Sequence, residues 1–404
     1  MTQLLRFVLP AAIGAVLLAA GPAAPARALD LAAEEALVVD HATGAVLLSK
    51  NPDLSVPPAS MLKLMTLNML FEAVADGRLS LDDRFTVSEK AWRMGGSKMF
   101  LRQGERVRVE DLIRGIVVLS GNDACVTVAE GLAGSEEAFA ARMTERAREL
   151  GMTGSVFGNS TGWPEASTRM SPRDLVFLAR RLITEFPQFY GYFAETDFEW
   201  DGVAQRNRNP LLYSDVGADG LKTGRTQEAG FGLVGSAERD GRRIVFMIGG
   251  YETTASRKTE AERLVDWAFR EFENRALYRA GQIVGAAEVW IGRARTLPLT
   301  LAEDVFATVP LAARDRITAT VSHEGPVEAP VAAGQPVGVL RVEAPDMDPI
   351  EVPVVAAEAV ERGGVLTRLS AAARLLAQDF LSDGAPEAPP VVTAPAPAPA
   401  VDDG

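Results

Sequence analysis

The amino-acid sequence predicts an α+β fold in which an antiparallel sheet packs against helices. Segments with strand character lie at both ends of residues 29–276, and the segments between them carry apolar residues at helical spacing. From about residue 277 the chain changes to short β-rich runs broken by Gly and Pro. These runs predict a small all-β domain at 277–363, and an amphipathic helix is expected after it.

The first 28 residues are expected to form a signal peptide rather than part of the fold. Arg6 supplies a positive charge, residues 7–20 are apolar, and Ala26-Arg27-Ala28 has the small-x-small pattern of a cleavage site. An uncleaved anchor is the alternative, although the apolar stretch is short for a span of ~20 residues. We therefore expect an exported protein, periplasmic or otherwise extracytoplasmic.

Residues 29–276 contain a regular series of expected elements. A hairpin is predicted around the turn at Gly44, because strand-like runs at 37–40 and 45–48 flank it. Helices are expected at 60–75, at 109–132, at 135–150 and from Ser171 onward. Strand candidates and a last helix complete this region, at 221–223, 232–236, 243–247 and 257–274.

The C-terminal part changes character twice. Four strand candidates lie in the all-β region, at 288–291, 305–309, 317–321 and 337–340. Apolar residues spaced by three and four then predict an amphipathic helix over 364–381. Peripheral contact with the outer face of the cytoplasmic membrane through 365–381 is one hypothesis, and packing on the β domain or self-association is the other. The Ala/Pro-rich residues 382–404 are expected to be disordered.

Composition excludes several classes of function. The chain of 404 residues has a formal net charge of −13, which argues against nucleic-acid binding. It has one cysteine, Cys125, and two histidines, His41 and His323. These counts argue against a disulfide framework, a Cys- or His-rich metal site and a His-based catalytic triad. We expect no metal and no cofactor, and a nucleophile that is activated by a group other than histidine.

The expected nucleophile is Ser60, the first residue of a Ser-Met-Leu-Lys run that ends at Lys63. Residues three apart on a helix share a face, so the Lys63 amine can reach the Ser60 hydroxyl. The prolines at 57 and 58 place Ser60 in the first turn, where the helix dipole favours developing negative charge. An ammonium cannot accept a proton, so Lys63 must be kept uncharged by burial or by a nearby cation.

Two further triplets strengthen this hypothesis. Ser120-Gly121-Asn122 ends an apolar run, where a turn would direct a hydroxyl and an amide into a cleft. Lys222-Thr223-Gly224 lies on a strand candidate, and its glycine leaves room for a substrate backbone. Each triplet alone is a weak signal. In the order Ser-x-x-Lys, Ser-x-Asn, Lys-Thr-Gly the set is typical of penicillin-binding proteins and class A β-lactamases.

The chain resembles the low-molecular-mass penicillin-binding proteins that act as serine-type D-alanyl-D-alanine carboxypeptidases. The resemblance extends over residues 29–381 and is carried by the stretches at 58–63, 120–125, 207–212 and 219–224. It implies a β-lactamase/transpeptidase-like catalytic domain at 29–276. It also implies that the partners are the peptidoglycan stem peptide and, as inhibitors, β-lactam antibiotics.

The resemblance further implies roles for individual residues. Ser60 attacks the carbonyl of the penultimate D-Ala, with Lys63 as general base and Ser120 as proton relay. Asn122 holds the substrate amide or Lys63, and Lys222 supplies positive charge near Ser120. The remaining substrate-binding residues are Thr223, Gly224, Arg225 and Arg257.

The resemblance also bears on the carboxylate site, the oxyanion hole and Arg225. Arg257, with Thr223, is implied to bind the terminal carboxylate of the substrate. The oxyanion hole is implied to consist of the backbone N–H of Ser60 and one from the strand beyond Gly224. Arg225 stands where family members often have Thr, Ser or His. Its guanidinium can add a carboxylate contact or crowd the cleft, which leaves substrate preference and β-lactam affinity open.

Two alternative functions share these motifs. A class A-like β-lactamase should carry a deacylating Glu followed closely by Leu-Asn, and Glu165 stands in a different context, Trp163-Pro164-Glu165. A non-catalytic β-lactam or cell-wall binding module would need neither a neutral lysine nor a deacylation path. The balance between carboxypeptidase and endopeptidase activity is left open by the sequence.

Overall fold

The computed structural model describes residues 29–365, 369 and 391–395. The predicted signal peptide lies outside the described residues, as do most of the predicted helix at 364–381 and most of the tail at 382–404. Within the described part of the tail, residues 391–395, Val391–Thr393 forms a strand, β18. This differs from the disorder expected there, because the Val-Val-Thr run supplies β-branched residues that pair with a neighbouring strand, β14.

A five-stranded antiparallel sheet forms the centre of the first domain, in the order β2-β1-β9-β8-β7. Its strands come from both ends of the domain, as predicted: β1 (Glu35–Asp40), β2 (Val46–Lys50), β7 (Ala218–Thr226), β8 (Gly230–Arg239) and β9 (Arg242–Tyr251). β7 is an edge strand, so the outer edge of its Lys-Thr-Gly segment is not paired with another strand of this sheet.

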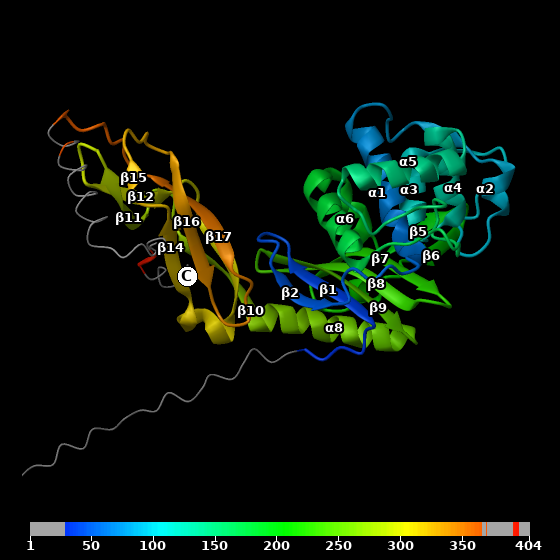
Figure 1. The fold of residues 1–404 in the computed structure, drawn as a ribbon. Coiled ribbons are helices and arrows are strands. Elements are labelled where there is room, and N and C mark those ends of the chain that lie inside the picture. Colours follow the sequence, from blue (N-terminus) through cyan, green and yellow to red (C-terminus); the bar gives the residue numbers. More distant parts are fainter. Residues whose placement is uncertain (1–28, 366–368, 370–390, 396–404) are drawn as a thin grey trace, which may run out of the picture.

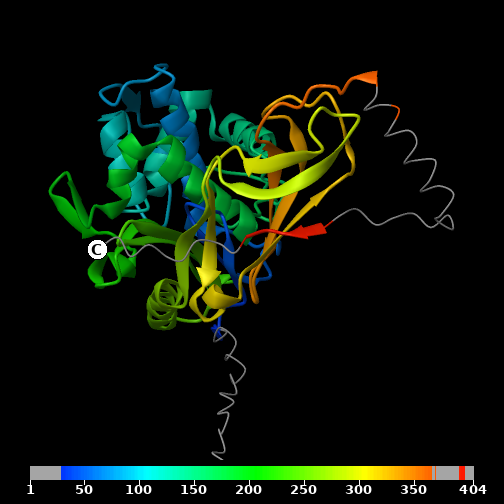
Figure 2. The same cartoon turned by 90° about the vertical axis from the view of Figure 1, so that its left-hand side faces the viewer.

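Helices cover both faces of the sheet (Figure 1). One face carries α8 (Thr254–Glu271), which begins with a capping box at Thr253. The other face carries α1 (Lys63–Ala75), α3 (Val109–Val117), α4 (Asn122–Ala133), α5 (Glu136–Glu149) and α6 (Pro172–Glu185). Figure 2 shows α8 almost end-on below the sheet and the helical layer above it.

The alternation of side chains along β1 explains why both faces are covered. Leu37 and Val39 belong to the core on the side of α1, whereas Ala36 and Val38 belong to the core on the side of α8. Successive residues of a strand point to opposite faces, so the four consecutive apolar residues at 36–39 need a layer on each side. All six residues of β1 are accordingly buried.

Short elements connect these layers. They are η1 (Ala59–Leu62), β3 (Arg84–Thr86), α2 (Glu89–Arg93), β4 (Arg106–Arg108), α7 (Pro187–Tyr190), η2 (Gly191–Ala194), β5 (Asp197–Trp200), β6 (Val203–Arg206) and η3 (Pro210–Tyr213). The pairs β3-β4 and β5-β6 are two-stranded antiparallel ribbons.

Two local predictions differ from the structure, and both differences lie at the predicted site. The helix expected from Ser60 begins as the 3₁₀ turn η1, and α1 starts at Lys63. The continuous helix expected from 109 to 132 is interrupted between α3 and α4, because Ser120 has a φ of 57°. A positive φ cannot be accommodated in a right-handed helix, so the chain turns at this residue.

The second domain is all-β, as predicted, and has its own apolar core. Its strands are β10 (Phe272–Tyr278), β11 (Ile283–Trp290), β12 (Thr296–Leu301), β13 (Val305–Pro310), β14 (Thr318–His323), β15 (Val327–Glu328), β16 (Pro336–Glu343) and β17 (Ile350–Ala356), with the 3₁₀ turn η4 (Leu311–Arg316). With β18 they form a seven-stranded sheet, β15-β11-β12-β17-β16-β14-β18, and a β10-β13 pair. None of the helices in the described part of the chain combines the length and apolar character that a membrane span requires.

Candidate active site

Three segments that are far apart in the sequence meet beside the edge strand β7. Ser60 and Lys63 come from η1 and the start of α1, Ser120 comes from the turn between α3 and α4, and Lys222 comes from β7. Lys63 Nζ lies 3.0 Å from Ser60 Oγ, and Lys222 Nζ lies 3.0 Å from Ser120 Oγ. The charge of Lys63 also acts on Lys222, so the two hydrogen-bonded pairs belong to one site.

Two glycines, Gly162 and Gly224, pack closely against the turn that carries Ser60. A Cβ on Gly162 would lie 1.8 Å from the carbonyl oxygen of Ala59, and a Cβ on Gly224 would lie 3.0 Å from the Ala59 Cβ. Ala59 itself has a φ of 49°, which is uncommon for a residue with a side chain. The position of Ser60 therefore depends on close backbone contact that only glycine permits.

The 3₁₀ geometry of η1 explains how the Ser60 hydroxyl and the Lys63 amine meet. Side chains three residues apart eclipse one another in a 3₁₀ helix, more closely than in an α-helix. Lys63 is fully buried and donates to Ser60 Oγ and, at 2.5 Å, to the carbonyl oxygen of Thr161. Burial lowers the pKa of Lys63 to about 8. About a tenth of this amine is therefore uncharged at pH 7, and the uncharged form is the one that a general base requires.

The second pair joins Ser120 to Lys222. Ser120 is buried, and its hydroxyl accepts a hydrogen bond from Lys222 Nζ. Burial, followed by the charges of Lys63 and Arg208, lowers the pKa of Lys222 well below its usual value. Lys222 Nζ also donates to the carbonyl oxygen of Thr223 at 3.2 Å. This arrangement gives a proton path between a buried hydroxyl and a buried amine.

The side chain of Asn122 bonds to a backbone carbonyl and not to Lys63, which was one of its two predicted partners. Its side-chain Nδ2 donates to the carbonyl oxygen of Gly95 at 2.8 Å, whereas Lys63 bonds to Ser60 and Thr161. The backbone N–H of Asn122 donates to the carbonyl oxygen of Ser97 at 2.8 Å. In this structure Asn122 therefore fixes the 95–97 loop beside the site.

Arg257 and Arg225 both lie near one aromatic ring, that of Phe231. The Arg257 guanidinium is 5.9 Å and the Arg225 guanidinium 4.9 Å from the centre of the Phe231 ring. Arg257 is buried, donates from Nη1 to the carbonyl oxygen of Gly232 at 3.2 Å, and has its pKa lowered to about 10 by burial. Its buried Nε has no hydrogen-bond partner among the described residues, which suits a group that awaits an anion. Arg225 is exposed.

Several residues at the site were not identified from the sequence. Asp123 accepts hydrogen bonds from the backbone N–H groups of Met99 and Leu101 and so anchors the loop before β4. Thr161 supplies the carbonyl that holds Lys63, and Arg208 Nε donates to the carbonyl oxygen of Leu119, next to Ser120. A buried Asp directly after a Ser-x-Asn triplet was an available signal. The role of the Thr161 carbonyl had no such signal, because every residue has a backbone carbonyl and the residue type does not show which one is used.

Cys125 does not belong to the reactive groups. It is fully buried on α4, and burial raises the pKa of its thiol to about 12. A thiol of this kind is not ionised near neutral pH and is a poor nucleophile. No cluster of three or more His, Cys, Asp or Glu side chains that could hold a metal ion occurs among the residues that the structure describes.

Comparison with known proteins identifies the family. The D-alanyl-D-alanine carboxypeptidase model, Peptidase S11, matches residues 21–252, and the model of the C-terminal domain of penicillin-binding protein 5 matches residues 272–362. D-alanyl-D-alanine carboxypeptidase DacD of Salmonella typhimurium is 35% identical over 342 residues, which are 83% of this chain and 88% of that protein.

Two solved structures have the same architecture. That of the D-alanyl-D-alanine carboxypeptidase DacD from Francisella tularensis has a TM-score of 0.77 and 28% identity, covering 84% of this chain and 96% of its own. That of penicillin binding protein 5 from Haemophilus influenzae has a TM-score of 0.74 and 30% identity, covering 83% and 99%. The resemblance first seen in three short motifs therefore extends over both domains, and the chain belongs to the S11 family of D-alanyl-D-alanine carboxypeptidases.

Proposed function

We propose that this protein is a serine-type carboxypeptidase that removes the terminal D-alanine from peptidoglycan pentapeptides through an acyl-enzyme on Ser60. The observation that carries the proposal is the buried Lys63 amine, 3.0 Å from the Ser60 hydroxyl and with a pKa lowered to about 8. Membership in the S11 family supplies the substrate class.

The first half-reaction follows from this geometry. Lys63 takes the Ser60 proton as the hydroxyl oxygen attacks the carbonyl carbon of the penultimate D-Ala. The resulting oxyanion is bound by the backbone N–H of Ser60 and one from β7 beyond Gly224. When the C–N bond breaks, Ser120, polarised by Lys222, passes its proton to the departing amine of the terminal D-Ala and takes a proton from the Lys63 ammonium, which becomes uncharged again. An ester on Ser60 remains.

The second half-reaction returns the free enzyme. Water attacks the ester carbonyl as Lys63 takes one of its protons, and Lys63 then returns that proton to the Ser60 oxygen as the C–O bond of the ester breaks. The substrate lies along the open edge of β7, where Thr223 and Arg257 bind its terminal carboxylate and Gly224 allows close approach. β-Lactams react with the same serine and give a penicilloyl ester.

The test is release of D-alanine from a peptide that ends in D-Ala-D-Ala, together with the intact mass of the protein after treatment with benzylpenicillin. We expect release and one long-lived adduct on Ser60, both abolished in Ser60→Ala and retained in Ser167→Ala, which removes an exposed hydroxyl. Rapid turnover of penicillin with no lasting adduct would instead identify a β-lactamase. An adduct without any release of D-alanine would identify a non-catalytic binding module.

The β-lactamase alternative has little support at Glu165. Its carboxylate is exposed and accepts hydrogen bonds from Asn159 Nδ2 at 3.1 Å and Ser167 Oγ at 2.8 Å. A deacylating carboxylate has to hold a water molecule against the ester instead. Endopeptidase activity on cross-linked peptides would use the same catalytic groups as carboxypeptidase activity. Comparing the rates on linear and cross-linked substrates measures the balance between these two activities.

We further propose that the protein acts outside the cytoplasm, with a catalytic domain at 29–276 and the all-β domain at 277–363. The positive n-region, apolar stretch and Ala-x-Ala pattern in residues 1–28 support export. N-terminal sequencing of the protein from an extracytoplasmic fraction should begin at Leu29. Liposome flotation with and without residues after Gly364 tests the membrane contact through 365–381, and equal flotation would exclude it.

A further inference from the structure

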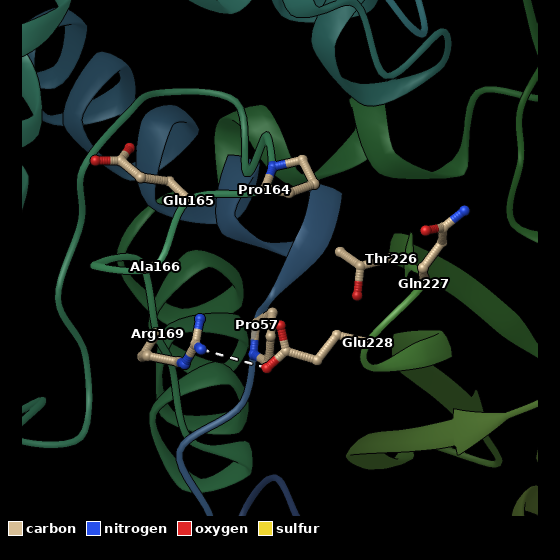
Figure 3. Close-up of a pocket in the computed structure, with 8 residues that line it drawn as sticks. All are labelled: Pro57, Pro164, Glu165, Ala166, Arg169, Thr226, Gln227 and Glu228. Atoms are coloured by element: carbon tan, nitrogen blue, oxygen red, sulfur yellow. Dashed lines mark hydrogen bonds and ion pairs between the residues drawn. The ribbon is translucent and has the colours of Figure 1, made fainter.

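The edge strand β7 is held differently at its two ends, and Lys222 lies between them. At the C-terminal end, a pocket of about 500 Å³ separates residues 226–228 from the loop at 164–169 (Figure 3). An ion pair crosses this pocket, with Arg169 Nη2 3.3 Å from Glu228 Oε1 and side chains that are 30% and 67% exposed. A pair this exposed contributes little, so other contacts have to fix the position of Lys222.

The N-terminal end of β7 is held by Asp219, three residues before Lys222. Asp219 Oδ1 accepts a hydrogen bond from the Tyr190 hydroxyl at 2.8 Å, and Asp219 Oδ2 lies 2.7 Å from Arg243 Nη1. The ion pair is more buried than the one at the other end, because its Arg and Asp side chains are 15% and 28% exposed. Arg243 belongs to β9 and also donates to Ser236 Oγ of β8 at 2.6 Å. Asp219 therefore ties β7 to the next two strands of the sheet and to Tyr190.

The contact with Tyr190 acts where the pairing of β7 with β8 is irregular. The register of this pairing shifts around Asp219, so the ladder of backbone hydrogen bonds is interrupted there. A Cβ on Gly220 would lie 3.0 Å from the Tyr190 hydroxyl oxygen. The 190–195 segment, which begins with this tyrosine, thus lies against the backbone of β7 two residues before Lys222.

The other end of the 190–195 segment is bound to α3, the helix that leads to Ser120. Arg114 of α3 donates from Nε to both carboxylate oxygens of Glu195, at 3.0 and 3.1 Å. Its guanidinium also lies 4.9 Å from the centre of the Tyr192 ring. Because α3 ends three residues before Ser120, these contacts hold the helix that carries the second member of the Ser120–Lys222 pair.

We propose that the 190–195 segment positions Lys222 against Ser120. Tyr190 and Glu195 are its positioning residues, one at each attachment, and the 3₁₀ turn η2 lies between them. The 3.0 Å hydrogen bond between the Lys222 amine and the Ser120 hydroxyl therefore joins two groups whose backbones are held by a single short turn. This inference rests on the proposed function and assigns residues to one step of it, the delivery of a proton to the leaving amine.

This step depends on the leaving group. An amine does not depart as an anion, so cleavage of an amide requires the proton that Ser120 delivers. A thiolate is a much weaker base and departs without a proton, and the proton that Lys63 has taken up then passes to solvent. Displacement of Lys222 from Ser120 should therefore slow the cleavage of an amide and leave that of a thioester nearly unchanged.

The experiment compares two substrates that share the same acyl part up to the penultimate D-Ala. One ends in D-alanine. In the other, sulfur replaces the nitrogen of the terminal residue, which gives a thioester with the same methyl and carboxylate groups. In Tyr190→Phe and Glu195→Ala, kcat/KM for release of D-alanine should fall about tenfold or more, because small misplacements are costly in catalysis. The kcat/KM for release of the thiol should stay within about twofold of the wild-type value.

A conservative variant tests the attachment to β7 separately. Asp219→Ala should behave like Tyr190→Phe, since both remove the hydrogen bond between the two side chains. Asp219→Asn should recover part of the amide rate, because its side-chain oxygen can still accept from the tyrosine hydroxyl. The thioester rate should be similar in all three variants.

Two matched controls lie away from the segment. Tyr278→Phe removes a buried hydroxyl that donates to the carbonyl oxygen of Pro395 at 2.9 Å. Asp266→Asn removes a carboxylate that lies 2.7 Å from Arg239 Nη2, the same separation as in the ion pair on β7. Both controls should leave the two kcat/KM values unchanged.

The possible failures are distinguishable. The ratio of the two kcat/KM values does not depend on the fraction of enzyme that is folded, so partial unfolding of a variant does not obscure the result. An equal loss on both substrates, or no loss on the amide, would reject the positioning role while leaving the carboxypeptidase intact. Failure of the wild type to release D-alanine would reject the proposed function itself.

Discussion

The two domains place their polar residues in opposite ways. Among the described residues, every buried Asp, Glu, Lys and Arg side chain lies in the first domain, including Lys63, Lys222 and Arg257. The buried polar residues of the second domain are Thr300, Thr308 and His323, in an otherwise apolar core.

The buried charged side chains of the first domain lower its stability and supply its reactive groups. Removing an amine from water without an ionic partner is unfavourable, and its pKa falls as a result. Lys63 and Lys222 both show this effect. The second domain has no comparable buried charge in its described part, so we expect substitutions there to change stability without changing the reaction.

The largest expected effect is that of Lys63→Met. Loss of a general base typically lowers the rate by about 10²- to 10⁴-fold, which D-alanine release measures directly.

The same substitution should also affect stability. Because the pKa of folded Lys63 is about 8 and its usual value is 10.5, the protonated amine is disfavoured in the folded state. The free-energy cost of burying the protonated amine is fully present below pH 8 and disappears as the pH rises through 10.5. The variant should therefore melt at an equal or higher temperature than the wild type at pH 7. A much lower melting temperature would contradict the stated cost of burial.

A pair of glycine variants gives the next largest contrast. Gly162 and Gly281 have nearly the same φ, 75° and 78°, but a Cβ on Gly162 would collide with Ala59, whereas one on Gly281 would meet nothing within 4 Å. Gly162→Ala should displace Ser60 and lower the rate of penicillin acylation by at least about tenfold, since small misplacements are costly in catalysis. Gly281→Ala should cost only about 1 kcal/mol of backbone strain, measured by denaturant unfolding. Equal acylation rates in the two variants would show that the contact with Ala59 does not position the serine.

The effect of pH on the rate of D-alanine release should be smaller than the effect of the Lys63 substitution. The reactive form of Lys63 is uncharged, so kcat/KM should rise as the pH increases through about 8 and level off above it. The change from pH 7 to the plateau should be about tenfold for a group with this pKa. A flat profile from pH 6 to 9 would show that another group accepts the serine proton.

The smallest effect on catalysis should come from substitutions in the core of the second domain. Leu340 on β16 is completely buried, and Leu340→Ala should lower the free energy of unfolding by about 2–5 kcal/mol. Activity per folded molecule should remain the same, because no second-domain side chain has been placed in the cleft. Leu67→Ala, equally buried on the helix that carries Lys63, should lower both stability and activity. A loss of activity in Leu340→Ala at full folding would indicate that the second domain acts on the site.

Much of the fold follows from local patterns in the chain. The apolar run at 36–39 inside β1 required a layer on each face, and the runs that became β7, β8 and β9 were recognisable as strands. The sequence indicates a turn at 120–122, but apolar residues continue on both sides of it, so the predicted helix at 109–132 runs through the break between α3 and α4. Contacts with Asn122, Asp123 and the 95–101 loop hold that turn, and they are all tertiary.

The sequence by itself determined the order of the motifs and the pairing of Ser60 with Lys63, because residues three apart are neighbours in any helical turn. Only the tertiary structure decided that Lys222 would meet Ser120, 102 residues away, and that the Thr161 carbonyl would hold Lys63. It also decided the lowered pKa of Lys63, since burial is a property of the packed fold. Such contacts depend on the closing of long loops around a shared core, and no local pattern of residues encodes them.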